Sequence, residues 1–159
     1  TVTILKTLLY ICKVIKEDLV RDFISYTNQS NIGLSSIIKS SIYETNPYLL
    51  QKSPSLIQYA AFFGSIKIFR YLMINNADLD SSIWLYAIHG NNPQIIYILE
   101  EYGIEPKDNT FVQCLEESIN CHHTNLSYYF ENNYFQCTKE NYNKIIRVLN
   151  HVISSKFII

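Results

Sequence analysis

The chain has 159 residues and a formal net charge of −1, and hydrophobic residues make up 48% of it against 17% for charged residues. This length is that of one domain, and the apolar share favours a folded core and argues against a disordered chain. The near-zero charge offers no electrostatic basis for binding nucleic acid.

Cysteine usage favours a reducing compartment. The four cysteines, Cys12, Cys114, Cys121 and Cys137, contain no CxxC pair and do not form a dense framework. We therefore expect reduced thiols in a cytoplasmic protein. No signal peptide and no apolar run of transmembrane length is evident in the sequence, so we expect no membrane partner.

The first third of the chain carries helical periodicity. Apolar residues recur at helical spacing from Ile4 to Ile24, which predicts one or two helices. A polar loop is expected over Thr27–Gly33 and a further helix over Leu34–Tyr43. That helix should end before Pro47, where a short helix opens, because the residue preceding proline disfavours the α region. We interpret residues 1–52 as an N-terminal helical cap, with a degenerate first repeat as an open alternative.

Residues 53–134 repeat one pattern three times. A small residue is followed by an apolar residue eight positions later and by another four positions after that, in the sets Ala60, Ile68 and Leu72; Ala87, Ile95 and Leu99; Ser118, Leu126 and Phe130. Self-similarity of this kind is typical of stacked helical repeats. We place units at 53–80, 81–108 and 109–134, each an antiparallel helix pair. Residues 135–159 are expected to form a C-terminal helical cap or the start of a further repeat.

Turn and capping residues set the expected helix boundaries. Ser53–Pro54 predicts the start of one helix and Asn92–Pro93 the start of another, because Ser and Asn cap helices and Pro suits the first helical position. Gly64 and Gly103 suit turns with positive φ, and Ser65 is expected to cap the helix that follows it. The predicted solvent-facing residues of the second helices are Lys67, Arg70, Asn75, Glu100 and Glu101.

The segment Leu56–Gly64, LIQYAAFFG, resembles the ankyrin-repeat pattern TPLHxAAxxG. Ile68 and Phe69 stand where that pattern has I-V, and Asn76–Asp78 stands at its G-A-D. More closely, the runs AAFFGSIKIF, YAIHGNN, QCL and CHH look like a divergent ankyrin-like family abundant in some parasitic protists. The resemblance covers residues 53–134 and implies an all-α, ankyrin-like solenoid of stacked antiparallel helix pairs.

The chain departs from the family pattern in its spacing. Ala60 and Ala87 are 27 residues apart, and Ala87 and Ser118 are 31 apart, where the family period is about 33. The missing residues of the first interval fall between Asp80 and Ser82, where ankyrin repeats carry a β-hairpin. We therefore predict shortened hairpin loops and expect the binding surface on the helices.

The resemblance further implies that the inner helices line a concave binding face. The residues expected on or near this face are Tyr59, Phe63, Ile83, Tyr86, Asn91, Asn92, Glu117 and His122. Tyrosine is favoured at the hot spots of protein interfaces. We expect Tyr59 and Tyr86 to be partly exposed and Trp84 to lie in the core.

One group of residues suggests metal or catalytic chemistry, namely Cys114, Cys121, His122, His123 and Cys137. Thiolate and imidazole are zinc ligands, and a Cys–His pair also forms a nucleophile with its base. The spacing matches no common zinc motif, and neither an orienting group nor an oxyanion hole can be named. We therefore expect turn or core roles for these residues, with no metal, no cofactor and no catalytic residue.

The resulting functional hypothesis is a non-catalytic protein–protein interaction module that binds a partner protein through the concave inner-helix face. No nucleic acid, membrane or small-molecule substrate is expected. One alternative is a structural or adaptor segment of a longer repeat protein with no partner site of its own. A less favoured alternative is a metal-binding protein or enzyme built on the Cys/His group.

Overall fold

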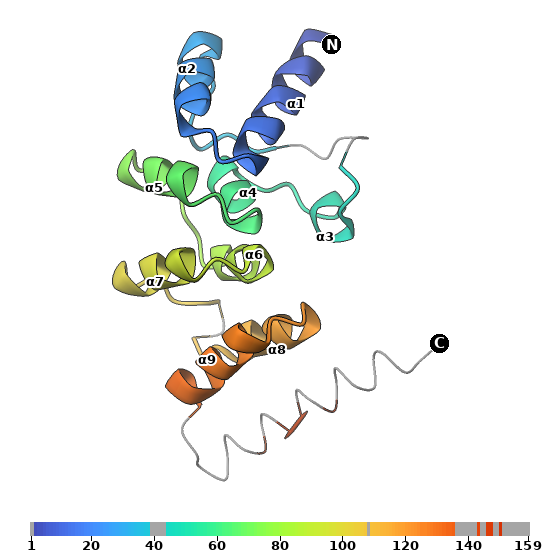
Figure 1. Ribbon diagram of the computed structural model, residues 1–159, viewed down its shortest axis with the longest axis vertical. Coiled ribbons are helices and arrows are strands. Elements are labelled where there is room, and N and C mark those ends of the chain that lie inside the picture. Colours follow the sequence, from blue (N-terminus) through green and yellow to red (C-terminus); the bar gives the residue numbers. More distant parts are fainter. Residues whose placement is uncertain are drawn as a thin grey trace. The chain divides into compact units, whose positions relative to one another are not determined.

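The computed structural model describes residues 2–38, 44–107 and 109–135, together with the isolated positions 143, 146, 147 and 150 (Figure 1). Within these residues the secondary structure is all α-helical, apart from one isolated β-bridge between Ile37 and Ser55. The chain divides into two compact units, residues 1–80 and 81–159. None of the described helices is both long enough and apolar enough to cross a bilayer.

The first unit contains α1 (Val2–Lys16), α2 (Val20–Ser30), α3 (Pro47–Leu50), α4 (Leu56–Phe62) and α5 (Ile66–Ile74). Its helices form two pairs, α1 with α2 and α4 with α5 (Figure 1). The two pairs stack, because α1 packs on α4 and α2 packs on α5. The side chains buried between them include Ile15, Phe23, Ile57 and Phe69, each fully excluded from solvent. Burial of this apolar surface is the main source of stability in such a stack.

The second unit contains α6 (Ile83–Gly90), α7 (Pro93–Glu101), α8 (Val112–Asn120) and α9 (Thr124–Tyr134). The pairs are α6 with α7 and α8 with α9, and α6 packs against α8. The core prediction for Trp84 is confirmed, since only 1% of it is exposed and its Nε1 donates a hydrogen bond of 2.7 Å to the Ile104 carbonyl. The rings of Phe111 and Phe130 meet the Trp84 ring edge to face.

One turn geometry recurs in all four helix pairs. A residue with positive φ separates the two helices of each pair: Asp18 (52°), Gly64 (66°), Asn91 (47°) and His122 (58°). Twelve or thirteen residues further on, another such residue ends the second helix of the first three pairs: Asn31, Asn76 and Gly103. Because this conformation directs backbone N–H groups onto the last helical carbonyls, it both stops the helix and satisfies its end.

Four of the residues that repeat in the sequence are acceptors at these helix ends. The carbonyl of Ala60 accepts from the Ser65 N–H, and the carbonyl of Ser118 accepts from the His123 N–H. Leu72 and Leu99 accept in the same way at the ends of α5 and α7. The carbonyl of Val14 accepts from Leu19, so the α1–α2 pair follows the same pattern without the small residue that marks it in the sequence.

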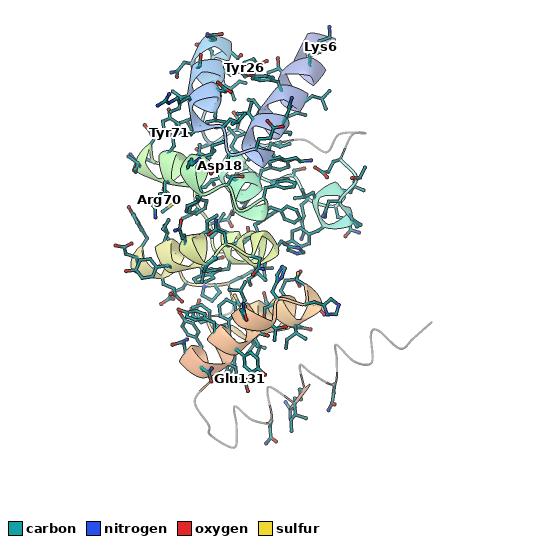
Figure 2. The ribbon with its side chains drawn as sticks, in the orientation of Figure 1. Lys6, Asp18, Tyr26, Arg70, Tyr71 and Glu131 are labelled. Atoms are coloured by element: carbon teal, nitrogen blue, oxygen red, sulfur yellow. The ribbon has the colours of Figure 1, made fainter. Side chains whose placement is uncertain are left out.

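Asp18 links the two helix pairs of the first unit. Its carboxylate accepts hydrogen bonds from the backbone N–H groups of Lys67 at 3.1 Å and Ile68 at 3.0 Å, which belong to the first turn of α5. Asp18 lies at the α1–α2 turn, next to α5 (Figure 2). A carboxylate at a helix N-terminus satisfies unpaired donors and interacts favourably with the helix dipole. Ser65, predicted to cap α5, instead donates its hydroxyl to the Ile15 carbonyl.

The start of α4 differs from the prediction at Ser53–Pro54. The helix begins at Leu56 and Ser55 is its cap: the Ser55 Oγ accepts from the Gln58 N–H, and the Gln58 side chain accepts from the Ser55 N–H at 2.8 Å. This reciprocal pair of bonds satisfies two donors at once. The Asn92–Pro93 start of α7 is confirmed, with the Asn92 side chain accepting from the Gln94 N–H.

Two further expectations for the first unit are wrong. The predicted Thr27–Gly33 loop begins later, because α2 continues to Ser30 and the Thr27 hydroxyl donates to the Phe23 carbonyl inside the helix. No helix covers the described part of the Leu34–Tyr43 prediction, residues 34–38, where Ile38 N–H bonds to the Pro54 carbonyl instead. Residues 39–43 lie outside the described residues, as does most of the segment 135–159 predicted to be a helical cap.

Replacing Asp18 tests the link between the helix pairs. Asp18→Ala should lower the free energy of unfolding by about 2–3 kcal/mol for two reasons. It removes the cap of α5, and alanine tolerates positive φ less well than aspartate because it has no polar side chain to form a local hydrogen bond. Asp18→Asn retains an acceptor and tolerates this φ, so its loss should stay under about 1 kcal/mol. Urea unfolding followed by circular dichroism measures both, and equal losses would contradict the capping role.

Ala61→Leu tests the closeness of packing in α4. Ala61 is fully buried, so the added carbons overpack the core and should cost about 1–3 kcal/mol. The matched control is Ile74→Leu on α5, where the side chain is 74% exposed and the melting temperature should not change. An unchanged melting temperature for Ala61→Leu would show that the helices do not approach closely at this residue.

Candidate functional site

Three of the eight residues predicted on the concave face are inaccessible. Of the residues placed on it, Ile83, Tyr59 and Tyr86 are buried, with exposed fractions of 0%, 2% and 5%. The expectation that Tyr59 and Tyr86 are partly exposed is therefore wrong. Of the remaining members, Phe63, Asn92 and Glu117 are half-buried, and Asn91 and His122 are exposed.

Tyr59 is buried because residues from the N-terminal part of the first unit cover it. Its hydroxyl donates a 3.2 Å hydrogen bond to Glu44, whose carboxylate lies 3.8 Å from the Lys16 ammonium. Lys16 in turn lies over the Phe63 ring, 4.8 Å from its centroid. Burial, followed by the neighbouring Cys12 thiol, raises the pKa of Tyr59 far above its usual value. A neutral phenol enclosed in this way cannot serve as a contact residue for a partner.

Tyr86 is buried because about half of the circumference of α6 is covered. Ile83, Trp84, Tyr86, Ala87 and Ile88 are all buried on that side, whereas Leu85 and His89 on the other side are half-buried. The part of the inner-helix face that α6 was predicted to supply through Ile83 and Tyr86 is therefore not accessible for recognition.

An accessible groove lies between α7 and α9 in the second unit. It encloses about 430 Å³ and is lined by Asn91, Pro93, Ile96, Tyr97, Glu100, Asn125, Leu126 and Tyr129. Ile96 and Leu126 are almost fully buried, whereas the Tyr97 side chain is 64% exposed. Clefts of about 300–1,000 Å³ that are lined mostly by apolar side chains with a few polar groups are typical of binding sites.

Glu100 supplies the charge of this groove. The Tyr129 hydroxyl lies 2.7 Å from both of its carboxylate oxygens, and the Tyr134 hydroxyl donates to it as well. Glu100 is half-buried, so the prediction that it faces water is wrong. Burial, then the hydrogen bond and the negative charge of Glu100, raise the pKa of Tyr129 from 10.0 to about 12. The carboxylate is therefore held in one position by neutral phenols.

The sequence does contain a signal for this groove. Pro93, Ile96, Tyr97 and Glu100 follow one another at spacings of three, one and three residues, which places them along one face of a helix. Asn91, the remaining lining residue from this part of the chain, was already predicted as a site residue. This spacing does not show that Tyr97 and Glu100 line a groove, because the solvent-facing residues of an ordinary helix have the same spacing.

A second cluster joins α6 to α8 and combines three kinds of donor. The His89 Nε2 lies 2.7 Å from the Glu117 Oε1, and the Cys121 Sγ lies 3.5 Å from the His89 Nδ1. The distance from the Cys121 Sγ to the Glu117 Oε1 is 4.0 Å. Among the described residues these three form a group whose ligand atoms are close enough to share one metal ion.

This cluster differs from the Cys/His group singled out in the sequence. Cys121 belongs to both, but its structural partners are His89 and Glu117 rather than its neighbours His122 and His123. Cys114 is fully buried, as expected for a core role. Cys137 lies outside the described residues. Cys121 and His89 are 32 residues apart, so their proximity depends on the packing of α6 on α8.

Comparison of the chain with protein-family models, curated proteins and solved structures finds no match. The resemblance to ankyrin repeats therefore depends on the sequence pattern of residues 53–134 and remains a prediction. The all-α architecture of the described residues is independent of that resemblance, because it follows from the coordinates alone.

The tyrosines around Glu100 predict a loss of stability at alkaline pH. The folded-state pKa of Tyr129 is raised to about 12 from 10.0, so its contribution is complete below pH 10 and is lost as the pH rises toward 12. The urea midpoint of the chain should fall over this interval, and Tyr129→Phe should make the fall shallower. Tyr128→Phe, which removes an exposed phenol from the same helix, should leave the slope as in the wild type.

Proposed function

We propose that the chain is an ankyrin-like, non-catalytic helical-repeat module that binds a protein partner through the groove between α7 and α9. The ankyrin-like assignment is supported by the sequence pattern and by the turn geometry that recurs in four helix pairs. Binding a protein partner is the function expected of such a module. The groove replaces the inner-helix face as the candidate surface, because Tyr59, Ile83 and Tyr86 are buried.

The observation that carries the proposal is the exposed aromatic side chain beside an apolar pocket with a fixed charge. Tyr97 is 64% exposed, and it borders the pocket that contains Ile96, Leu126 and the Glu100 carboxylate. Exposed tyrosines next to apolar pockets are favoured at interface hot spots. An apolar side chain of a partner would fill the pocket and release water from Ile96 and Leu126.

The negative charge of Glu100 indicates which kind of partner segment would bind in the groove. Its carboxylate is held by the hydroxyls of Tyr129 and Tyr134 and is the charged group among the lining residues. A partner segment that carries a lysine or arginine close to an apolar residue would match both features, because opposite charges improve specificity and association. The proposed partner is thus a basic, apolar segment of another protein.

Selection of peptides on the full chain tests this function. A displayed peptide library should yield binders that combine an apolar residue with Lys or Arg, and Tyr97→Ala should weaken them by about thirtyfold, the effect of losing about 2 kcal/mol at a hot spot. Glu100→Gln should weaken them as well, chiefly at low salt. Isothermal titration calorimetry measures the affinities.

The matched control is Tyr128→Ala on α9, where a tyrosine of similar exposure, 61%, lies outside the groove. Its peptide affinities should equal those of the wild type. Peptides that bind Tyr97→Ala and the wild type equally well would show that the groove is not the binding surface. A selection that yields no peptide would favour the alternative of a structural or adaptor segment without a partner site.

A further inference from the structure

The cluster of His89, Glu117 and Cys121 shares no side chain with the groove and suggests a different chemistry. His89 lies in the last turn of α6, Glu117 lies in α8, and Cys121 is the residue that ends α8. Glu117 and Cys121 are four residues apart and so lie on the same face of α8. The packing of α6 on α8 brings His89 to that face.

The positions of these residues are set by well-defined backbone. His89 is two residues before Asn91, whose left-handed conformation ends α6, and Cys121 directly precedes His122, whose left-handed conformation follows α8. The Cys121 N–H bonds to the Glu117 carbonyl at 2.9 Å. The donors therefore stand on helix ends that are closed by hydrogen bonds rather than on long loops.

The spacing of the donor atoms is close to that of a tetrahedral metal site. With Zn–S of about 2.3 Å and Zn–N or Zn–O of about 2.0–2.2 Å, the ligand atoms around one zinc ion lie about 3.3–3.6 Å apart. Measured from the His89 Nε2, the ring nitrogen beside Glu117, the separations are 2.7 Å to the Glu117 Oε1 and 3.9 Å to the Cys121 Sγ, and the Cys121 Sγ lies 4.0 Å from the Glu117 Oε1. Side-chain rotations that lengthen the first distance and shorten the other two would give the tetrahedral spacing.

We propose that His89, Glu117 and Cys121 bind one zinc ion, or a divalent ion of similar softness, with water as the fourth ligand. A thiolate and a carboxylate together balance the double positive charge, and the neutral imidazole completes the protein ligands. When the ion binds, the Cys121 S–H bond breaks, the sulfur electron pair forms the metal–sulfur bond and the proton leaves to water. Sulfur and nitrogen donors disfavour magnesium and calcium, which prefer oxygen.

The site is accessible to an ion from solvent. The side chains of His89 and Glu117 are 18% and 24% exposed, and Cys121 is also half-buried. A metal ion there would connect the end of α6 to the end of α8 and would stabilise their packing. Binding of the ion should therefore raise the stability of the fold, which can be measured without an activity assay.

Cobalt and zinc titrations of the full chain test the proposal. Co²⁺ should bind at one ion per chain and produce the visible bands of tetrahedral cobalt together with a thiolate charge-transfer band, and Zn²⁺ should displace it. His89→Gln, Glu117→Gln and Cys121→Ser should each weaken binding at least about tenfold. Cys121→Ser should also abolish the charge-transfer band, and zinc should raise the melting temperature of the wild type but not of these three variants.

Matched controls separate this site from other cysteines and histidines. His122→Gln, Glu116→Gln and Cys12→Ser change the same residue types nearby or elsewhere in the chain, and all three should keep the wild-type affinity and spectrum. Thermal unfolding of each metal-free variant verifies that it is folded. The proposal is overturned if micromolar zinc does not bind, if binding survives in the three site variants, or if His122→Gln abolishes it while His89→Gln does not.

Discussion

The left-handed residue that separates the two helices of each pair is the constraint on which the rest of this structure depends. Asp18, Gly64, Asn91 and His122 each lie in a turn of two or three residues that ends one helix and leads into the next. Each turn places the second helix beside the first, so that their apolar faces meet and become buried. Because glycine, asparagine and aspartate adopt this conformation at low cost, three of these four positions fit their backbone well.

Two residues other than Gly, Asn and Asp have positive φ among the described residues, namely His122 and Phe111, each with φ of 58°. Histidine adopts this conformation more readily than most residues, whereas for phenylalanine it is uncommon and costs on the order of 1–3 kcal/mol. Phe111 is held by its surroundings, because its ring stacks on Tyr134 with centroids 3.7 Å apart and contacts Trp84. His122 directly follows Cys121, the residue at the end of the helix that carries Glu117.

The difference in burial between the helices explains where an accessible surface remains in the second unit. In the second unit, α6 buries the side that carries Ile83 and Tyr86, which removes these two residues from the surface. The second helices α7 and α9 leave between them the groove that contains Tyr97 and Glu100. The proposed metal cluster uses α6 and α8, and His89 is only two residues from Asn91 at the groove. Recognition and metal binding would therefore share the α6–α7 turn while they use different side chains.

The sequence by itself determined the helical class, the spacing of the helix pairs and several of their ends. Apolar periodicity, Gly64, Gly103 and Asn92–Pro93 act within a few residues, so local rules are sufficient to interpret them. Only the tertiary structure decided that Asp18 caps a helix 49 residues away. It also decided that Tyr59 lies beneath Glu44, that Glu100 is held by Tyr129 and that Cys121 meets His89. These contacts join residues far apart in the chain, and residue type alone does not distinguish a tyrosine that is covered from one that is exposed.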